Sequence, residues 1–207
     1  MTLHEPATLL TDYFLGLLGS GLAYRLFRRI SPGNKAAHWW IAALLVMSVA
    51  AFTGGTYHGF GLNFTPGVTA VWWQMVRILI CATGLCMSIS QLWEILPPER
   101  HRPWLGIIIA KSLLASVWIL VDARFLVVLL DYGISMTAWL AAALVYRRPW
   151  SVWILTAVGL SALAGLVQQT QWGLSNHFNH NDVYHLIQAT ALVAFYRAGA
   201  WLGRATS

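Results

Sequence analysis

The chain has 207 residues, of which 58% are hydrophobic and only 10% are charged, and its formal net charge is +6. A soluble domain carries roughly 25% charged residues, so this composition excludes a water-soluble protein and predicts an integral membrane protein. The basic residues lie scattered at the ends of apolar segments, as membrane proteins distribute them. We therefore expect membrane lipids as partners and no nucleic acid.

Seven stretches in chain order have the length and apolar character of a spanning helix, which needs roughly 20 mostly apolar residues. The breaks between them contain turn and loop residues, such as SPGNK and PPERHRP. We expect an all-α integral membrane protein, a single seven-transmembrane-helix bundle over residues 1–207. The predicted helices cover approximately residues 9–27, 37–57, 68–91, 104–121, 124–146, 150–169 and 182–203.

The orientation follows from the positions of lysine and arginine, which concentrate in cytoplasmic connections. They gather in the first, third and fifth connections and in the C-terminal tail, at Arg25, Arg28, Arg29, Lys35, Arg100, Arg102, Arg147, Arg148 and Arg204. This pattern places the N-terminus outside and the C-terminus in the cytoplasm. We expect a multi-pass protein of the bacterial inner (plasma) membrane.

Twelve tryptophans are unusually many for this length. Several lie near predicted helix ends, where an aromatic belt at the lipid headgroup level is typical. We interpret them as such a belt, with a cage for a pigment or substrate as the alternative. They are Trp39, Trp40, Trp72, Trp73, Trp104, Trp150 and Trp201.

Polar side chains gather in the outer half of the predicted bundle. An intramembrane charge is costly and usually faces the bundle interior with a partner. Arg77 lies at a depth where it could meet Asp131 or Asp12, either as a structural ion pair or as a functional one. The gathered residues are Asp12, His58, Arg77, Asp122, Asp131, His177, His180, Asp182 and His185.

Residues 176–185, NHFNHNDVYH, contain three histidines directly before an apolar run. Asn179 or Asn181 could cap the last helix, and Asp182 in its first turn suits the positive end of the helix dipole. Capping does not explain His185, which lies one turn into the helix, or His58 at the same membrane level. Hydrogen-bonded core histidines are one interpretation, and a zinc site with an open position for water is the other.

Two short motifs, TGGTYHGF around His58 and NDVYHLIQ around His185, together with seven helices and an outside N-terminus, resemble a superfamily of membrane hydrolases. It contains the alkaline ceramidases, the adiponectin and progestin receptors, and lipases that remodel GPI anchors. In that superfamily a helix-two motif S-x-x-x-H and a helix-seven motif H-x-x-x-H supply three zinc-binding histidines. The resemblance implies zinc-dependent hydrolysis of a lipid-like amide or ester.

The sequence departs from these motifs at two positions. Gly54 stands where the superfamily has serine, although Thr53 is adjacent, and Asn181 stands where it has the first helix-seven histidine. The resemblance then implies a changed ligand set. The implied metal ligands are His58, His185 and His180, with His177 or Asp182 as substitutes for the third, and the catalytic candidates are Asp12, Asp182 and Thr53.

Three other functions fit the residues. The chain could be a non-catalytic accessory or receptor-like subunit, since small residues along its helices allow close packing with a partner. It could be a redox subunit that binds haem or a pigment through His58 and His185. It could also be a transporter in which Arg77 and Asp131 form a relay.

Overall fold

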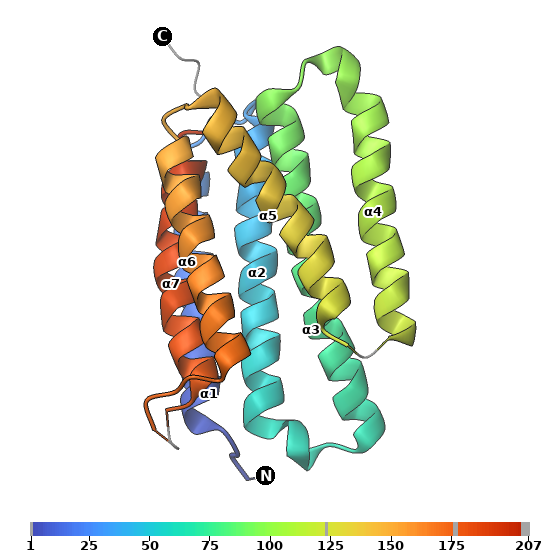
Figure 1. The fold of residues 1–207 in the computed structure, drawn as a ribbon, viewed down its shortest axis with the longest axis vertical. Helices are drawn as coiled ribbons and strands as arrows, with labels where there is room; N and C mark the ends of the chain where they lie inside the picture. Colours follow the sequence, from blue (N-terminus) through green and yellow to red (C-terminus); the bar gives the residue numbers. More distant parts are fainter. Residues whose placement is uncertain (1, 123, 176–177, 204–207) are drawn as a thin grey trace.

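The computed structural model describes residues 2–122, 124–175 and 178–203. Within this part the chain is all-α, without a β-strand, which confirms the predicted all-α class (Figure 1). Each helix lies in its predicted stretch, although α3 is longer than expected and α7 ends earlier. The helices are α1 (Pro6–Phe27), α2 (Lys35–Phe60), α3 (Pro66–Ile95), α4 (His101–Val121), α5 (Leu126–Tyr146), α6 (Ser151–Thr170) and α7 (His180–Gly199), with 3-10 turns η1 (Gly61–Asn63) and η2 (Pro98–Arg100).

The helices run alternately in opposite directions along the long axis of the bundle (Figure 1). We call the end at which α1, α3, α5 and α7 begin the N-terminal end, and the end at which they finish the C-terminal end. Because α1 and α7 start at the same end and pack against each other, their first turns lie side by side. This parallel pair positions the candidate site.

Five helical stretches are long and apolar enough to cross a membrane, by length and composition. The chain is therefore a membrane protein with a helical bundle, as its composition predicts. Helices α1 and α7 are not among these five, and their crossing stays a prediction. The five stretches are Lys35–Asn63, Pro66–Ile95, Pro98–Val121, Leu126–Tyr146 and Ser151–Thr170.

The helix starts use ordinary local signals. Pro6 and Pro66 each stand in the first turn of a helix, where a missing N–H costs nothing because those N–H groups have no partner within the helix. The side chain of Asn34 caps α2 by accepting a hydrogen bond from the backbone N–H of Ala37 at 3.0 Å. Local sequence thus fixes where these helices begin.

Three tryptophans form part of the bundle core. The ring of Trp139 lies 4.9 Å from that of Trp40 and 5.4 Å from that of Trp150, edge to face in both cases. Trp40 donates its indole N–H to the carbonyl of Phe195 at 2.9 Å, and Trp150 donates to Glu94 at 2.8 Å. The predicted lipid-facing positions of Trp40 and Trp150 are therefore wrong, because each buried indole finds an acceptor inside the bundle.

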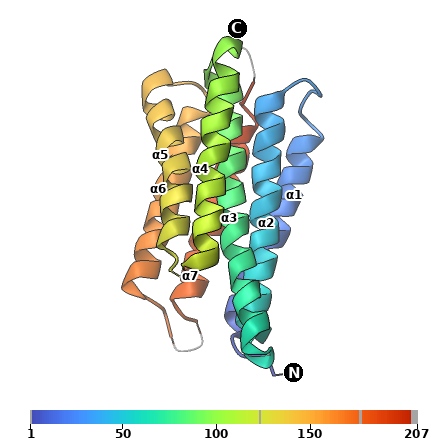
Figure 2. The same cartoon turned by 90° about the vertical axis from the view of Figure 1, so that its right-hand side faces the viewer.

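Helix α4 lies at the edge of the bundle, against α3 and α5 (Figure 2). A buried ion pair connects it to α5, with Lys111 Nζ 2.6 Å from Asp131 Oδ1. Arg77 instead donates to the backbone carbonyl of Asp122 at 2.7 Å. The predicted pairing of Arg77 with Asp131 or Asp12 is therefore wrong. Asp131 pairs with Lys111, and Asp12 pairs with His185.

Candidate functional site

The start of α7 is built by a capping box. The side chain of Asn179 accepts a hydrogen bond from the N–H of Asn181 at 2.8 Å, and the Asp182 carboxylate accepts one from the N–H of Asn179 at 2.6 Å. Asp182 is fully buried, and the predicted capping role of these residues is confirmed. Gln168 of α6 donates to Asn181 at 2.9 Å. The first turn of α7 is thus held in a fixed place beside α1.

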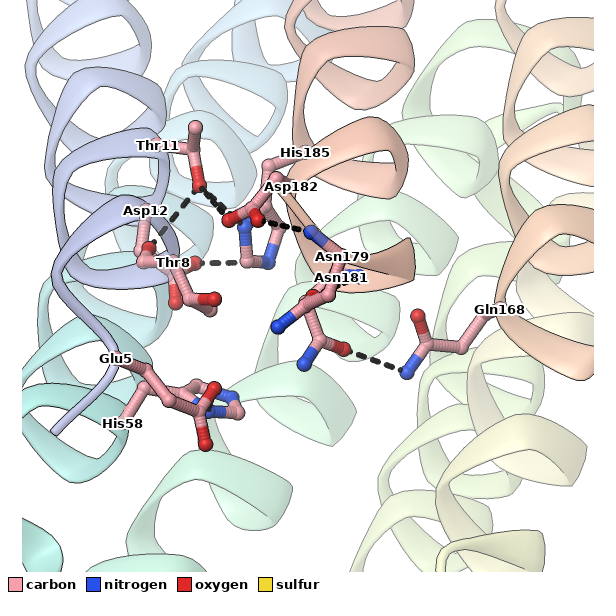
Figure 3. Close-up of polar contacts among 10 residues, drawn as sticks. All are labelled: Glu5, Thr8, Thr11, Asp12, His58, Gln168, Asn179, Asn181, Asp182 and His185. Atoms are coloured by element: carbon pink, nitrogen blue, oxygen red, sulfur yellow. Dashed lines mark hydrogen bonds and ion pairs between the residues drawn. The ribbon is translucent and has the colours of Figure 1, made fainter. Parts of the chain in front are cut away.

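One turn further along α7, His185 bridges to α1 through both ring nitrogens (Figure 3). Its Nδ1 atom lies 3.0 Å from Thr11 Oγ1, and its Nε2 atom lies 3.1 Å from Asp12 Oδ1. Thr11 Oγ1 also lies 3.4 Å from Asp182 Oδ1. We call these four residues, Thr11, Asp12, Asp182 and His185, the α1–α7 cluster. Asp12 is 5% exposed and His185 8%, so the cluster is shielded from solvent.

The contacts of His185 allow the Thr11 hydroxyl to donate to the imidazole. When Asp12 is ionised it can only accept a hydrogen bond, so Nε2 of His185 then carries the proton and Nδ1 is the acceptor. The Thr11 hydroxyl then donates to Nδ1. A hydroxyl, an imidazole and a carboxylate follow one another within hydrogen-bond distance, the arrangement in which a base activates a hydroxyl nucleophile and a third group orients the base.

Glycines of α2 make room for Asp12. A Cβ atom placed on Gly54 would lie 3.4 Å from Asp12 Oδ2, and one placed on Gly55 would lie 2.9 Å from Asp12 Cβ. The carboxylate thus packs against bare α2 backbone, at the position where the resembling hydrolases carry serine. The departure at Gly54 therefore lies directly beside Asp12, one of the catalytic candidates.

His58 belongs to a separate pair near the end of the bundle (Figure 3). Its Nδ1 atom lies 3.0 Å from Glu5 Oε2, and the two side chains are 23% and 43% exposed. Each imidazole has its own carboxylate partner, Glu5 for His58 and Asp12 for His185, and a joint site of the two histidines stays a prediction. A haem held by these two histidines would require both pairs to separate.

The other predicted site residues have different surroundings. Thr53 donates its hydroxyl to the carbonyl of Val49, one turn earlier in α2, at 2.7 Å. His180 is the first residue of α7 and is half-buried. His177 lies outside the described residues. Of the predicted set, the cluster therefore contains Asp12, Asp182 and His185.

A zinc site needs several His, Cys, Asp or Glu donors close together. Residues 2–122, 124–175 and 178–203 contain no group of three or more such side chains that could hold a metal ion. His185 uses both ring nitrogens on Thr11 and Asp12, so ligation would require one of those contacts to break. The donor set does not fit zinc in this arrangement, and the zinc site stays a prediction.

Sequence reasoning missed Thr11, the residue that contacts His185 together with Asp12. It also missed Thr8, whose buried hydroxyl has no hydrogen-bond partner among the described residues. Thr8, Thr11 and Asp12 are spaced three and four apart, so they share one face of α1. That spacing was the available signal, because three polar side chains on one face of an apolar helix need a polar surrounding.

The chain belongs to the family of unknown function DUF6962, which it matches over residues 7–203. No curated protein and no solved structure matches the chain. Family membership therefore names no reaction, and the chemistry must be inferred from the geometry of the α1–α7 cluster.

Proposed function

We propose that this member of DUF6962 is a membrane hydrolase that cleaves an amide or ester bond of a lipid-like substrate. The observation that supports the proposal is the His185 imidazole between the Thr11 hydroxyl at 3.0 Å and the Asp12 carboxylate at 3.1 Å. Hydrolases on unrelated folds use this hydroxyl–imidazole–carboxylate order, which is recognised by geometry rather than by sequence position.

In the proposed reaction, Nδ1 of His185 takes the proton from Thr11 Oγ1 as that oxygen attacks the substrate carbonyl carbon. Asp12 holds the ring and stabilises the imidazolium that forms. His185 then gives the proton to the leaving amine or alcohol, which departs and leaves an acyl group esterified to Thr11. Water, deprotonated by the same imidazole, hydrolyses this ester and restores the Thr11 hydroxyl.

The buried Thr8 hydroxyl gives the site an unused polar group. Thr8 is 1% exposed and its Oγ1 atom has no partner among the described residues, although an unpartnered buried polar group costs about 1–3 kcal/mol. The Thr11 Oγ1 atom lies 3.1 Å from the backbone carbonyl of Thr8, and this contact does not involve the Thr8 hydroxyl. We assign the free hydroxyl to a polar group of the substrate, which would offset this cost.

We also propose that α1 and α7 cross the membrane with the other helices, with the N-terminus outside and the C-terminus in the cytoplasm of a bacterium. Their 22 and 20 residues correspond to about 33 and 30 Å, which matches a hydrocarbon core of about 30 Å. Both helices lie alongside α2. The basic connections at the C-terminal end of the bundle support the cytoplasmic placement of that end.

Turnover of defined lipids tests the proposal. The full chain, purified in detergent and returned to liposomes, is given ceramide as a lipid amide and a lysophospholipid as a lipid ester, and released fatty acid is measured by mass spectrometry. We expect turnover of at least one class and a loss of about 10²–10⁴-fold in Thr11→Val. Thr190→Val is the matched control, since Thr190 is an exposed α7 residue that bonds only its own helix. Equal rates in the two variants would refute the role of Thr11.

A further inference from the structure

A second polar site lies at the opposite end of the same helix pair. A cavity of about 530 Å³ opens between the C-terminal ends of α1 and α7. Leu18, Leu22 and Val193 supply an apolar wall, and Arg25, Arg29 and Arg197 supply three guanidinium groups. The volume is in the range of roughly 300–1,000 Å³ that is typical of sites for small ligands.

In the part of the chain that the structure describes, the three arginines bring positive charge together without a carboxylate. Among the described residues, none of the three forms an ion pair, whereas Arg124 pairs with Asp122 at 2.6 Å and Arg148 with Glu94 at 3.5 Å. The contacts of the three are of other kinds. Arg29 donates to the hydroxyl of Tyr196 at 3.3 Å, and Arg197 lies over the ring of Trp153 at 5.4 Å.

Only these three arginines line the cavity, and the other described basic residues of the connection after α1 do not. Arg28 is adjacent to Arg29, but its guanidinium donates to Tyr24 at 3.3 Å and does not line the cavity. The positive-inside distribution explains why basic residues occur at this end of the bundle. It does not explain why arginines from α1, from the turn after α1 and from α7 line one cavity that also has an apolar wall.

We propose that this cavity binds an anionic glycerophospholipid, with its phosphate between Arg25, Arg29 and Arg197 and an acyl chain along the apolar wall. Guanidinium groups bind phosphate with paired hydrogen bonds. Basic pockets between transmembrane helices on the cytoplasmic side take such headgroups. A free phosphate would use the arginines but not Leu18, Leu22 and Val193, so the apolar wall favours the lipid.

Native mass spectrometry of the full chain in detergent tests this site. Dioleoylphosphatidylglycerol is titrated against dioleoylphosphatidylcholine, and the bound lipid is counted per chain. We expect saturable binding of one phosphatidylglycerol and weaker binding of phosphatidylcholine. Arg25→Gln, Arg29→Gln and Arg197→Gln should each weaken phosphatidylglycerol binding roughly fivefold. Arg28→Gln is the matched control, with affinity unchanged, and the unfolding temperature of each variant checks its fold.

Two further measurements separate the sources of phosphate. Inorganic phosphate and glycerol 3-phosphate are added as competitors, and the proposal predicts that millimolar amounts displace little lipid. Equal loss of affinity in Arg28→Gln and the cavity variants would overturn the site. Full displacement by inorganic phosphate would overturn the assignment to a lipid. Because the site lies at the opposite end from the α1–α7 cluster, binding should persist in Thr11→Val, so failure here and failure of the hydrolase proposal are distinguishable.

Discussion

Nε2 of His185 lies 3.1 Å from Oδ1 of Asp12, and this contact connects the last helix of the chain to the first. The same imidazole reaches Thr11 through its other nitrogen. The residues assigned to chemistry therefore also hold α1 against α7. Loss of activity in a variant must consequently be compared with its stability before it is assigned to catalysis.

A double-mutant cycle measures the coupling between Asp12 and His185. Removal of one partner leaves a buried polar group unpaired, so Asp12→Ala and His185→Ala should each cost about 3–5 kcal/mol in the free energy of unfolding. The double variant should cost less than the sum, with a coupling of about 0.5–3 kcal/mol. Unfolding in mixed micelles with sodium dodecyl sulfate gives the values. Asp12→Ala combined with His38→Ala, at the other end of the bundle, should be additive.

Two adjacent glycines of α2 should differ in their tolerance of a methyl group. A Cβ on Gly55 would lie 2.8 Å from Tyr13 Cδ1 and 2.9 Å from Asp12 Cβ, whereas the nearest atom to a Cβ on Gly54 is Asp12 Oδ2 at 3.4 Å. Gly55→Ala should therefore destabilise the protein by about 1–3 kcal/mol through overpacking. Gly54→Ala should change stability little. Thermal unfolding of both variants checks this, and equal effects would show that the α1–α2 packing is described wrongly.

The Lys111–Asp131 pair should be required for the attachment of α4. Asp131 is 3% exposed and its Oδ2 atom already has no partner among the described residues. Lys111→Met would leave the remaining carboxylate unpaired, at a cost of about 3–5 kcal/mol. The double variant Lys111→Met/Asp131→Asn should recover part of this loss, since no charge then remains. If the double variant unfolds as easily as the single one, the pair is not the cause.

Metal analysis decides between the zinc motif and the cluster. A zinc ion on His58, His180 and His185 would require His58 to leave Glu5 and His185 to release Thr11 or Asp12. We therefore expect less than one zinc per purified chain and turnover that survives a chelator. One zinc per chain, lost in both His58→Ala and His185→Ala, would contradict the metal-free scheme and restore the three-histidine site.

The helices were predictable because each is an apolar stretch of membrane-spanning length bounded by turn residues. Capping by Asn179 and Asp182 was also predictable, because it depends only on residues that are three apart in the sequence. The burial of Trp40 and Trp150 was not, because an indole at a helix end satisfies its N–H equally at a lipid interface or inside a bundle. Only the packing of the helices decides which of the two occurs.

The partners of the charged residues were the least predictable part of the site. Depth along a helix suggested that Arg77 could meet Asp131, but depth does not tell which helix is adjacent, and Lys111 of α4 takes that place. In the same way, the sequence placed His58 and His185 at one level of the membrane but did not predict that Glu5 pairs with His58 and Asp12 with His185. Thr11 was overlooked because a threonine in an apolar helix usually bonds its own backbone.

The most direct measurement is a search for the acyl group on Thr11. The liposome-bound chain is mixed with a lipid ester or ceramide, quenched in acid within the first turnovers and digested, and the peptide with Thr11 is analysed by mass spectrometry. The proposal predicts an added fatty acyl group on Thr11 that is absent in His185→Ala and unchanged in Thr190→Val. Turnover with no acyl group on Thr11, and with an undiminished rate in Thr11→Val, would contradict it.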